Sequence, residues 1–107
     1  MTLRFGEIVL AWIAYHQTPG GKTRPAVVLI DSGDADCVLA PITSHPWQSK
    51  FDLQRQDWRE AKLNVPSTIR VHKMTVIPKS SIARSVGSLS SPDRQRLSHL
   101  LADAFRE

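Results

Sequence analysis

The chain has 107 residues, of which 41% are hydrophobic and 22% charged, a composition typical of a folded domain and unlike that of a disordered chain. Its 14 Lys and Arg residues against 10 Asp and Glu give a net charge of +4 and a pI near 9.7, which suits a polyanionic partner but also an ordinary basic surface. The apolar runs are too short for a membrane span and no export signal opens the chain, so we expect one cytoplasmic domain over residues 1–107, with no membrane partner.

The cysteine and histidine content gives no indication of a cofactor. Cys37 is the only cysteine and cannot form a disulfide within the chain. No second thiol, cluster of histidines or glycine-rich phosphate loop predicts a site for a metal or a nucleotide. We therefore expect the protein to act without a metal or other cofactor.

The first half of the sequence predicts three strands. A β-branched and aromatic run predicts the first over residues 8–15, and the polar segment 16–23, with a proline and paired glycines, is expected to be a loop. The apolar run 25–30 is short and rich in valine, which favours a buried strand over a helix. Residues 37–42 predict a third strand, which the polar residues 43–46 end.

Shorter segments follow. Phe51 and Leu53 flank Asp52, and this alternation predicts a short, half-buried strand. Residues 54–66 are mixed and indicate at most a helical turn around Trp58. Further strands are expected over 68–71 and 74–77, the second ended by Pro78, and residues 82–89 are expected to be irregular with a turn at Gly87.

The end of the sequence predicts an amphipathic helix. Ser91 is a suitable N-cap, Pro92 suits the first helical position, and Asp93 complements the positive end of the helix dipole. One predicted face carries Leu97, Leu100, Leu101, Ala104 and Phe105, and the other Arg94, Arg96, Asp103 and Arg106. Five or six short strands and a terminal helix indicate a mostly β fold, a small antiparallel barrel with a C-terminal α-helix.

Three stretches of the sequence together resemble a known family. They are Phe-Gly-Glu-Ile-Val-Leu at 5–10, Gly-Lys-Thr-Arg-Pro-Ala-Val-Val-Leu at 21–29 and Ala-Pro-Ile-Thr-Ser at 40–44. They resemble the PemK/MazF-like growth inhibitors, the toxins of type II toxin–antitoxin systems. Trp58 with residues 63–70, and then residues 82–90, also fit the pattern, so the similarity runs in order along nearly the whole chain.

The resemblance implies both a fold and an activity. The implied fold is an SH3-like barrel that forms a homodimer. The implied activity is that of a sequence-specific, metal-independent endoribonuclease, which cleaves single-stranded RNA such as mRNA by attack of a ribose 2′-hydroxyl on the adjacent phosphate. The implied protein partner is a cognate antitoxin.

Several residues match the site that the resemblance implies. Arg24 corresponds to a catalytic arginine and Thr43 to a catalytic hydroxyl donor, with Ser44 as its companion in RNA binding. Arg24 could stabilise the charge on the phosphate, since it lies between a glycine-rich segment and a buried strand. Without the resemblance, the favoured reading of Arg24 would be a surface residue at a strand end, and the two hydroxyls would be ordinary turn residues. Lys22 and Arg70 are further candidate RNA contacts, although Arg70 could also be an outward-facing strand residue.

One segment departs from the family pattern. Well-studied members have an Arg-Thr-Ile-Asp type segment where this chain has Thr-Val-Ile-Pro at 75–78, which contains neither an arginine nor a carboxylate. The departure favours a second reading, in which the chain is a non-catalytic SH3-like barrel that binds RNA or a protein partner. If the chain is an enzyme, His16, His45 and His72 are candidate substitutes, because imidazole exchanges protons near neutral pH.

The tryptophans have different expected roles. Trp47 lies in a polar loop, where it could stack on an unpaired base or contact a partner chain. Trp58 could also stack on a base, but a core position is the preferred reading. Trp12 belongs to the first predicted strand and is expected to pack inside the fold.

Overall fold

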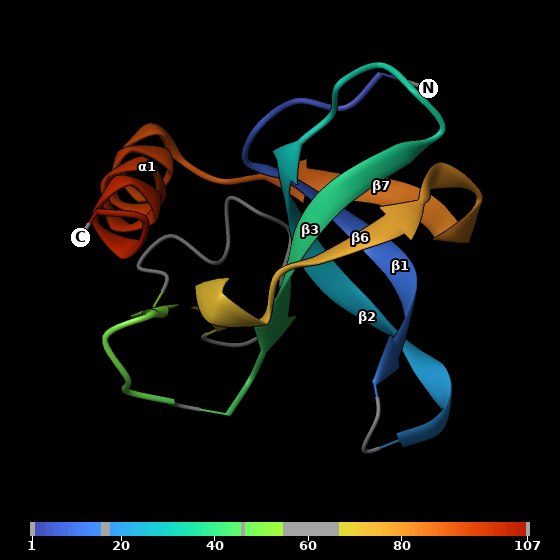
Figure 1. Ribbon diagram of the computed structural model, residues 1–107, viewed down its shortest axis with the longest axis horizontal. Helices are drawn as coiled ribbons and strands as arrows, with labels where there is room; N and C mark the ends of the chain where they lie inside the picture. Colours follow the sequence, from blue (N-terminus) through green and yellow to red (C-terminus); the bar gives the residue numbers. More distant parts are fainter. Residues whose placement is uncertain (1, 16–17, 46, 55–66, 107) are drawn as a thin grey trace.

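Three long antiparallel strands form the centre of the molecule (Figure 1). They are β1 (Glu7–Tyr15), β2 (Thr18–Ile30) and β3 (Asp36–Thr43). The computed structural model describes residues 2–15, 18–45, 47–54 and 67–106. The predicted strands 8–15, 25–30 and 37–42 are confirmed. Their ends agree with the structure within two residues, except for the start of β2.

The loop predicted over residues 16–23 is wrong for most of its length. β2 begins at Thr18, and its first residues pair with β1, with Thr23 opposite Trp12 and Lys22 opposite Ile13. Proline and glycine in this segment indicated a loop, because both are unfavourable in strands. The pairing with β1 outweighs that preference and lengthens the hairpin, a long-range contact that the local composition does not reveal.

One edge of β3 is shared by two short strands. Its first half pairs with β6 (Thr75–Pro78), from Asp36 opposite Pro78 to Leu39 opposite Thr75. Its end pairs with β5 (Thr68–Arg70), with Ile42 opposite Ile69. The three-residue 3-10 turn η1 (Val71–Lys73) separates the two blocks. The turn brings residues 71–73 out of the sheet beside the end of β3.

The remaining strands lie at the edges of the sheet. β4 (Asp52–Gln54) pairs with β5, and β7 (Ile82–Ser88), reached through the 3-10 turn η2 (Lys79–Ser81), pairs with β1. The prediction of a turn at Gly87 is wrong, because Gly87 lies within β7 opposite Ile8, where the register shifts. A bulge explains the irregular pattern of this segment without ending the strand.

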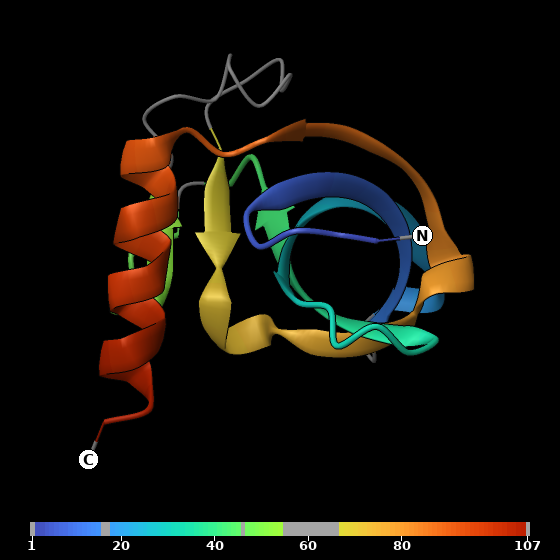
Figure 2. The same ribbon diagram turned by 90° about the horizontal axis from the view of Figure 1, so that it is seen from above.

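The sheet is strongly curled, with the order β4-β5-β3-β2-β1-β7 and β6 beside β3 (Figure 2). The predicted mostly β fold with a C-terminal helix is confirmed. The pairings of the described strands do not close the sheet, so the expected barrel is open between β4 and β7. The sheet stays open because one edge of β3 pairs with β6 along its first half and with β5 at its end. β5 and β4 therefore do not follow the curl that β1, β2 and β7 form.

Buried side chains form two clusters on opposite faces of the central strands. Alternation in β2 places Ala26 and Val28 in one cluster and Val27 and Leu29 in the other. The first cluster lies inside the curl, and the second lies between the sheet and the helix and includes Leu97. Both faces are covered, which explains why the run 26–29 is apolar without interruption.

The terminal helix α1 (Ser91–Ala104) is confirmed, with corrections at both ends. Its N-cap is Ser90 rather than Ser91, since the Ser90 hydroxyl accepts a hydrogen bond from the Asp93 N–H. Phe105 follows the last helical residue and is 74% exposed, so its predicted place on the buried face is wrong. Because Phe105 lies beyond the end of the helix, its ring does not continue the apolar helix face to which Leu97 belongs.

Gly6 lets the chain enter β1 beneath the helix. Its φ of +88° favours glycine, and a Cβ there would lie 2.7 Å from the Arg94 Cδ. The Arg94 guanidinium donates to the Leu89 carbonyl and to the Ser91 hydroxyl. The expected solvent-facing position of Arg94 is therefore only partly correct, because its aliphatic part packs over the turn at Gly6. In the described part of the chain no helix has the length and apolarity to cross a membrane.

Candidate functional site

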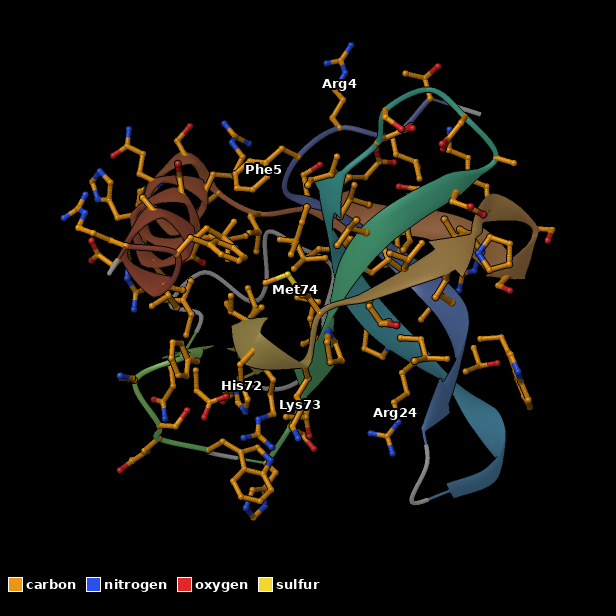
Figure 3. The ribbon with its side chains drawn as sticks, in the orientation of Figure 1. Arg4, Phe5, Arg24, His72, Lys73 and Met74 are labelled. Atoms are coloured by element: carbon orange, nitrogen blue, oxygen red, sulfur yellow. The ribbon has the colours of Figure 1, made fainter. Side chains whose placement is uncertain are left out.

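Arg24 lies in the middle of β2, on the inner face of the sheet. It is opposite Ala11 of β1, whose side chain is fully buried in the inner cluster, and alternation places Arg24 on the same face as Ala26. The side chain is half-buried, and its Nε atom is buried. Arg24 extends toward the side of the molecule where His72 and Lys73 lie, away from Arg4 and Phe5 (Figure 3). The buried Nε therefore restricts the position of the guanidinium.

Thr43 occupies the corresponding position on the next strand. The last pair between β2 and β3 is Ala26 with Pro41, and Arg24 and Thr43 each lie two residues beyond that pair along their own strands. Thr43 is half-buried, pairs with Thr68 of β5, and accepts a hydrogen bond from the His45 N–H at 3.2 Å. Alternation therefore places Arg24 and Thr43 on the same face of the neighbouring strands β2 and β3, an arrangement that can present several donors to one anion.

A third basic residue, Arg70, is fixed by its neighbours. Its Nε donates to the Asp52 carboxylate at 2.9 Å, an ion pair between the neighbouring strands β5 and β4. Its guanidinium carbon lies 4.1 Å from the centre of the Trp47 ring, a cation–π contact. Its Nη2 is 3.3 Å from His72 Nε2. These three contacts fix the plane of the guanidinium.

Two of the candidate histidines, His45 and His72, lie within the described residues, and both are close to Arg70 and the aromatic rings around it. The His45 ring centre is 4.5 Å from that of Trp47, and the His72 ring is 5.6 Å from that of Phe51. Loss of solvent, followed by the charge of Arg70, lowers the pKa of His72 below its usual 6.5. His72 is therefore mainly neutral near pH 7, in the state in which Nε2 can accept a hydrogen bond from Arg70.

Asp52 was not among the residues that the sequence indicated for the site. Its side chain is 0% exposed. Burial raises the pKa of Asp52, but hydrogen bonds from Ser49 and Arg70 outweigh burial and give a net lowering. The alternation around Asp52 predicted a short, half-buried strand, but the partner of this carboxylate is 18 residues away in the sequence. Strand pairing alone creates the contact.

The other predicted site residues are not brought into this cluster by any contact of the described residues. Ser44 is exposed just after β3, and Lys22 is placed only by its backbone in β2. His16 and Trp58 lie outside the described residues. Residues 75–78, the segment that contains neither an arginine nor a carboxylate, form β6, where Val76 is 63% exposed.

Trp12 corrects another expectation. It was expected to pack inside the fold but is 49% exposed. Its neighbours Ala11 and Ile13 belong to the inner cluster, so alternation turns Trp12 to the outer face. Within the described part of the chain, no group of three or more His, Cys, Asp or Glu side chains is arranged to hold a metal ion.

Residues 4–105 match the family model described as the PemK-like, MazF-like toxin of type II toxin–antitoxin systems. The chain belongs to this toxin family. The resemblance drawn from its motifs is thereby confirmed, and the match extends over almost the whole chain. A search of curated proteins gave no significant match.

Solved structures of similar fold include mycobacterial toxins and endoribonucleases. The Mycobacterium tuberculosis toxin MazF-mt6 has a TM-score of 0.77 and 21% identity, over 92% of this chain and 95% of that one. An endoribonuclease from a mycobacterial species, solved in complex with its cognate antitoxin, has a TM-score of 0.77 and 12% identity, over 96% of this chain and 94% of that one. A further M. tuberculosis toxin has a TM-score of 0.72 and 20% identity, over 92% and 99%. At these identities the similarity establishes a shared fold.

Proposed function

We propose that this toxin is a metal-independent endoribonuclease that cuts single-stranded RNA, mRNA included, at specific sequences and thereby inhibits growth. The observation that carries the proposal is that alternation places Arg24 and Thr43 on the same face of the neighbouring strands β2 and β3, in a chain of this toxin family. We further propose that it acts in the cytoplasm as a homodimer and that a cognate antitoxin neutralises it.

The proposed reaction needs no cofactor. The ribose 2′-oxygen attacks the adjacent phosphorus and loses its proton, and the bond from phosphorus to the 5′-oxygen breaks. The products are a 2′,3′-cyclic phosphate and a 5′-hydroxyl that has gained a proton. Negative charge increases on the phosphate oxygens in the transition state, where Arg24 and the Thr43 hydroxyl donate hydrogen bonds. Ser44 and Lys22 are proposed as further contacts to the RNA.

Proton transfer is the step for which this chain differs from well-studied members. The family's Arg-Thr-Ile-Asp type segment is replaced by residues 75–78, which supply no acid or base. We propose His45 and His72 as the replacement, because His45 follows Thr43 closely and both rings belong to the same set of contacts. Replacing each with glutamine should remove one limb of the pH–rate profile if that histidine transfers the proton.

The same departure supports a second candidate function. An SH3-like domain that binds RNA without cutting it, or that binds a protein, is also consistent with Arg24, Thr43 and the basic charge, and it needs no proton-transfer groups. Incubating purified protein with a long RNA in excess chelator, and mapping the ends, separates the two. Enzyme activity predicts cuts at a recurring sequence with 2′,3′-cyclic phosphate and 5′-hydroxyl ends. Uncut RNA, bound equally well by wild type and Arg24→Ala protein, would establish the binding module instead.

A further inference from the structure

The cluster around Trp47 has a composition that phosphate binding does not explain. The Trp47 ring is 44% exposed, although Arg70 lies against it and the His45 ring is nearby. Asp52 neutralises Arg70 through an ion pair in which the carboxylate is fully buried. A basic residue intended for phosphate would offer a net positive charge, whereas this pair offers a flat, nearly neutral surface with guanidinium hydrogens at its edge.

We propose that Trp47 and Arg70 form a subsite for one unpaired base of the RNA, beside the phosphate that Arg24 and Thr43 contact. The inference rests on the proposed function for its substrate class. A base is flat and uncharged and has acceptors at its edge, so it can stack on the exposed indole and accept hydrogen bonds from a fixed guanidinium. Asp52 is a positioning residue, since its ion pair with Arg70 Nε sets the plane of the guanidinium.

The position of the subsite follows from a continuous set of contacts. The His45 N–H donates to the Thr43 hydroxyl, the His45 ring lies 4.5 Å from Trp47, and Trp47 lies 4.1 Å from Arg70. Trp47 is only four residues beyond Thr43 in the sequence. A nucleotide whose phosphate is at Thr43 therefore has its base, or that of its neighbour, within reach of the ring. Bases in a duplex are stacked and paired, so only single-stranded RNA can fill the subsite.

The first test measures binding without turnover. Labelled 2′-O-methyl oligonucleotides lack the attacking hydroxyl, and an abasic strand of equal length carries the same number of phosphates. We expect wild-type protein to prefer the strand with bases. Trp47→Ala should weaken binding of that strand by roughly ten- to a hundredfold, the usual effect of losing one stacked base, and leave the abasic strand unaffected. Trp47→Phe should restore part of the loss.

The chain provides a matched control for the aromatic ring. Trp12 is exposed to a similar extent but faces outward from β1, so Trp12→Ala should leave the affinities for both strands unchanged. The proposal is overturned if Trp47→Ala weakens both strands equally or neither. It is also overturned if wild-type protein binds both strands equally, a result that would favour a protein partner for this ring.

Arg70 is tested by the shape of its side chain. Arg70→Lys retains the charge but loses the flat surface, and Asp52→Asn retains the shape of its own side chain but weakens the ion pair. Both should reduce the preference for bases while sparing the abasic strand, and Arg84→Lys on the exposed edge strand β7 is the control. An equal loss on the abasic strand would assign Arg70 to phosphate and refute the subsite. Because no cleavage is needed, failure here is distinct from failure of the endoribonuclease proposal, which mapped RNA ends decide.

Discussion

Arg24 and Thr43 are expected to contribute unequally to catalysis. The guanidinium of Arg24 can donate two hydrogen bonds and carries the charge that the transition state needs most. Arg24→Ala should slow RNA cleavage by on the order of a hundredfold or more, equivalent to ~3 kcal/mol of transition-state stabilisation. Arg24→Lys should restore only part of the rate, because an ammonium lacks the two-pronged geometry. Single-turnover cleavage rates give the comparison.

Thr43→Val provides a milder substitution at the same site. It deletes one hydroxyl and keeps the shape of the side chain, so its cleavage rate should lie between those of wild type and Arg24→Ala. Circular dichroism spectra and melting curves of all variants should match the wild type. If Arg24→Ala retained the wild-type rate in a folded protein, Arg24 would have no catalytic role.

His72 makes a prediction that is independent of RNA. Loss of solvent and the charge of Arg70 lower the pKa of its ring, so the folded state disfavours the protonated form. Stability from this group is present above the usual value of 6.5 and decreases as the pH falls below it. An NMR titration of the histidine rings should give His72 a midpoint below 6.5. Arg70→Gln should move that midpoint upward, and an unchanged midpoint would contradict the assigned contact.

At the scale of elements, the start of α1 allows a direct comparison of two serines. The Ser90 hydroxyl caps the helix by accepting from the Asp93 N–H, whereas the exposed Ser91 hydroxyl accepts from the Arg94 side chain. Ser90→Ala should cost about 1 kcal/mol and lower the melting temperature by roughly 5 °C. Ser91→Ala should have a much smaller effect in the same calorimetric measurement. The reverse order would restore Ser91 as the cap.

The loop after β2 is joined to η2 and to the N-terminal segment by Asp31. Its carboxylate binds Lys79 Nζ at 2.7 Å and accepts from the Leu3 and Gly33 N–H groups. The hydrogen bond from Lys79, and then those from the two backbone groups, lower the pKa of Asp31 from 3.8 to about 2. Its stabilising effect is therefore complete above pH 3.8 and is lost as the pH falls through about 2.

Melting temperatures measured against pH test this assignment. Asp31→Asn should melt below wild type at neutral pH, and the difference should shrink as the pH falls from 3.8 toward 2. Asp103→Asn is the control, because Asp103 and Arg106 form an exposed pair of the kind that contributes little. A difference for Asp31→Asn that stays constant over this pH range would show that its role does not depend on the charge.

At the scale of the whole molecule, we predict a homodimer. Light scattering at micromolar concentration should give about twice the chain mass of 12.0 kDa. The edges of the curled sheet and the outer surface of α1 offer surface for association between copies. A monomer over the whole concentration range would contradict the dimer and any site shared between subunits.

RNA binding should also show the basic character of the chain. Affinity for single-stranded RNA should fall steeply with salt, because binding releases counterions from the phosphates. Affinity for duplex RNA should be lower at every salt concentration, since its bases are not accessible for stacking. Filter-binding titrations at several salt concentrations make the comparison, and equal affinities would rule out base recognition.

Local sequence determined the parts of this protein whose contacts are short-range or repetitive. The apolar run in β2 predicted a buried strand, and the spacing of Leu97, Leu100 and Leu101 predicted the face of α1. Five motifs in the right order, among them those containing Arg24 and Thr43, indicated the toxin family, which the family model confirmed.

Tertiary structure decided the rest, because strand pairing joins residues that are far apart in the sequence. Pairing with β1 made residues 18–23 a strand against their local preference, and alternation within the sheet turned Trp12 outward. Asp52 meets Arg70 only because β4 lies beside β5, and Arg70 then meets Trp47 and His72. Composition and periodicity describe a residue's own segment, whereas these contacts depend on which segments become neighbours when the sheet curls.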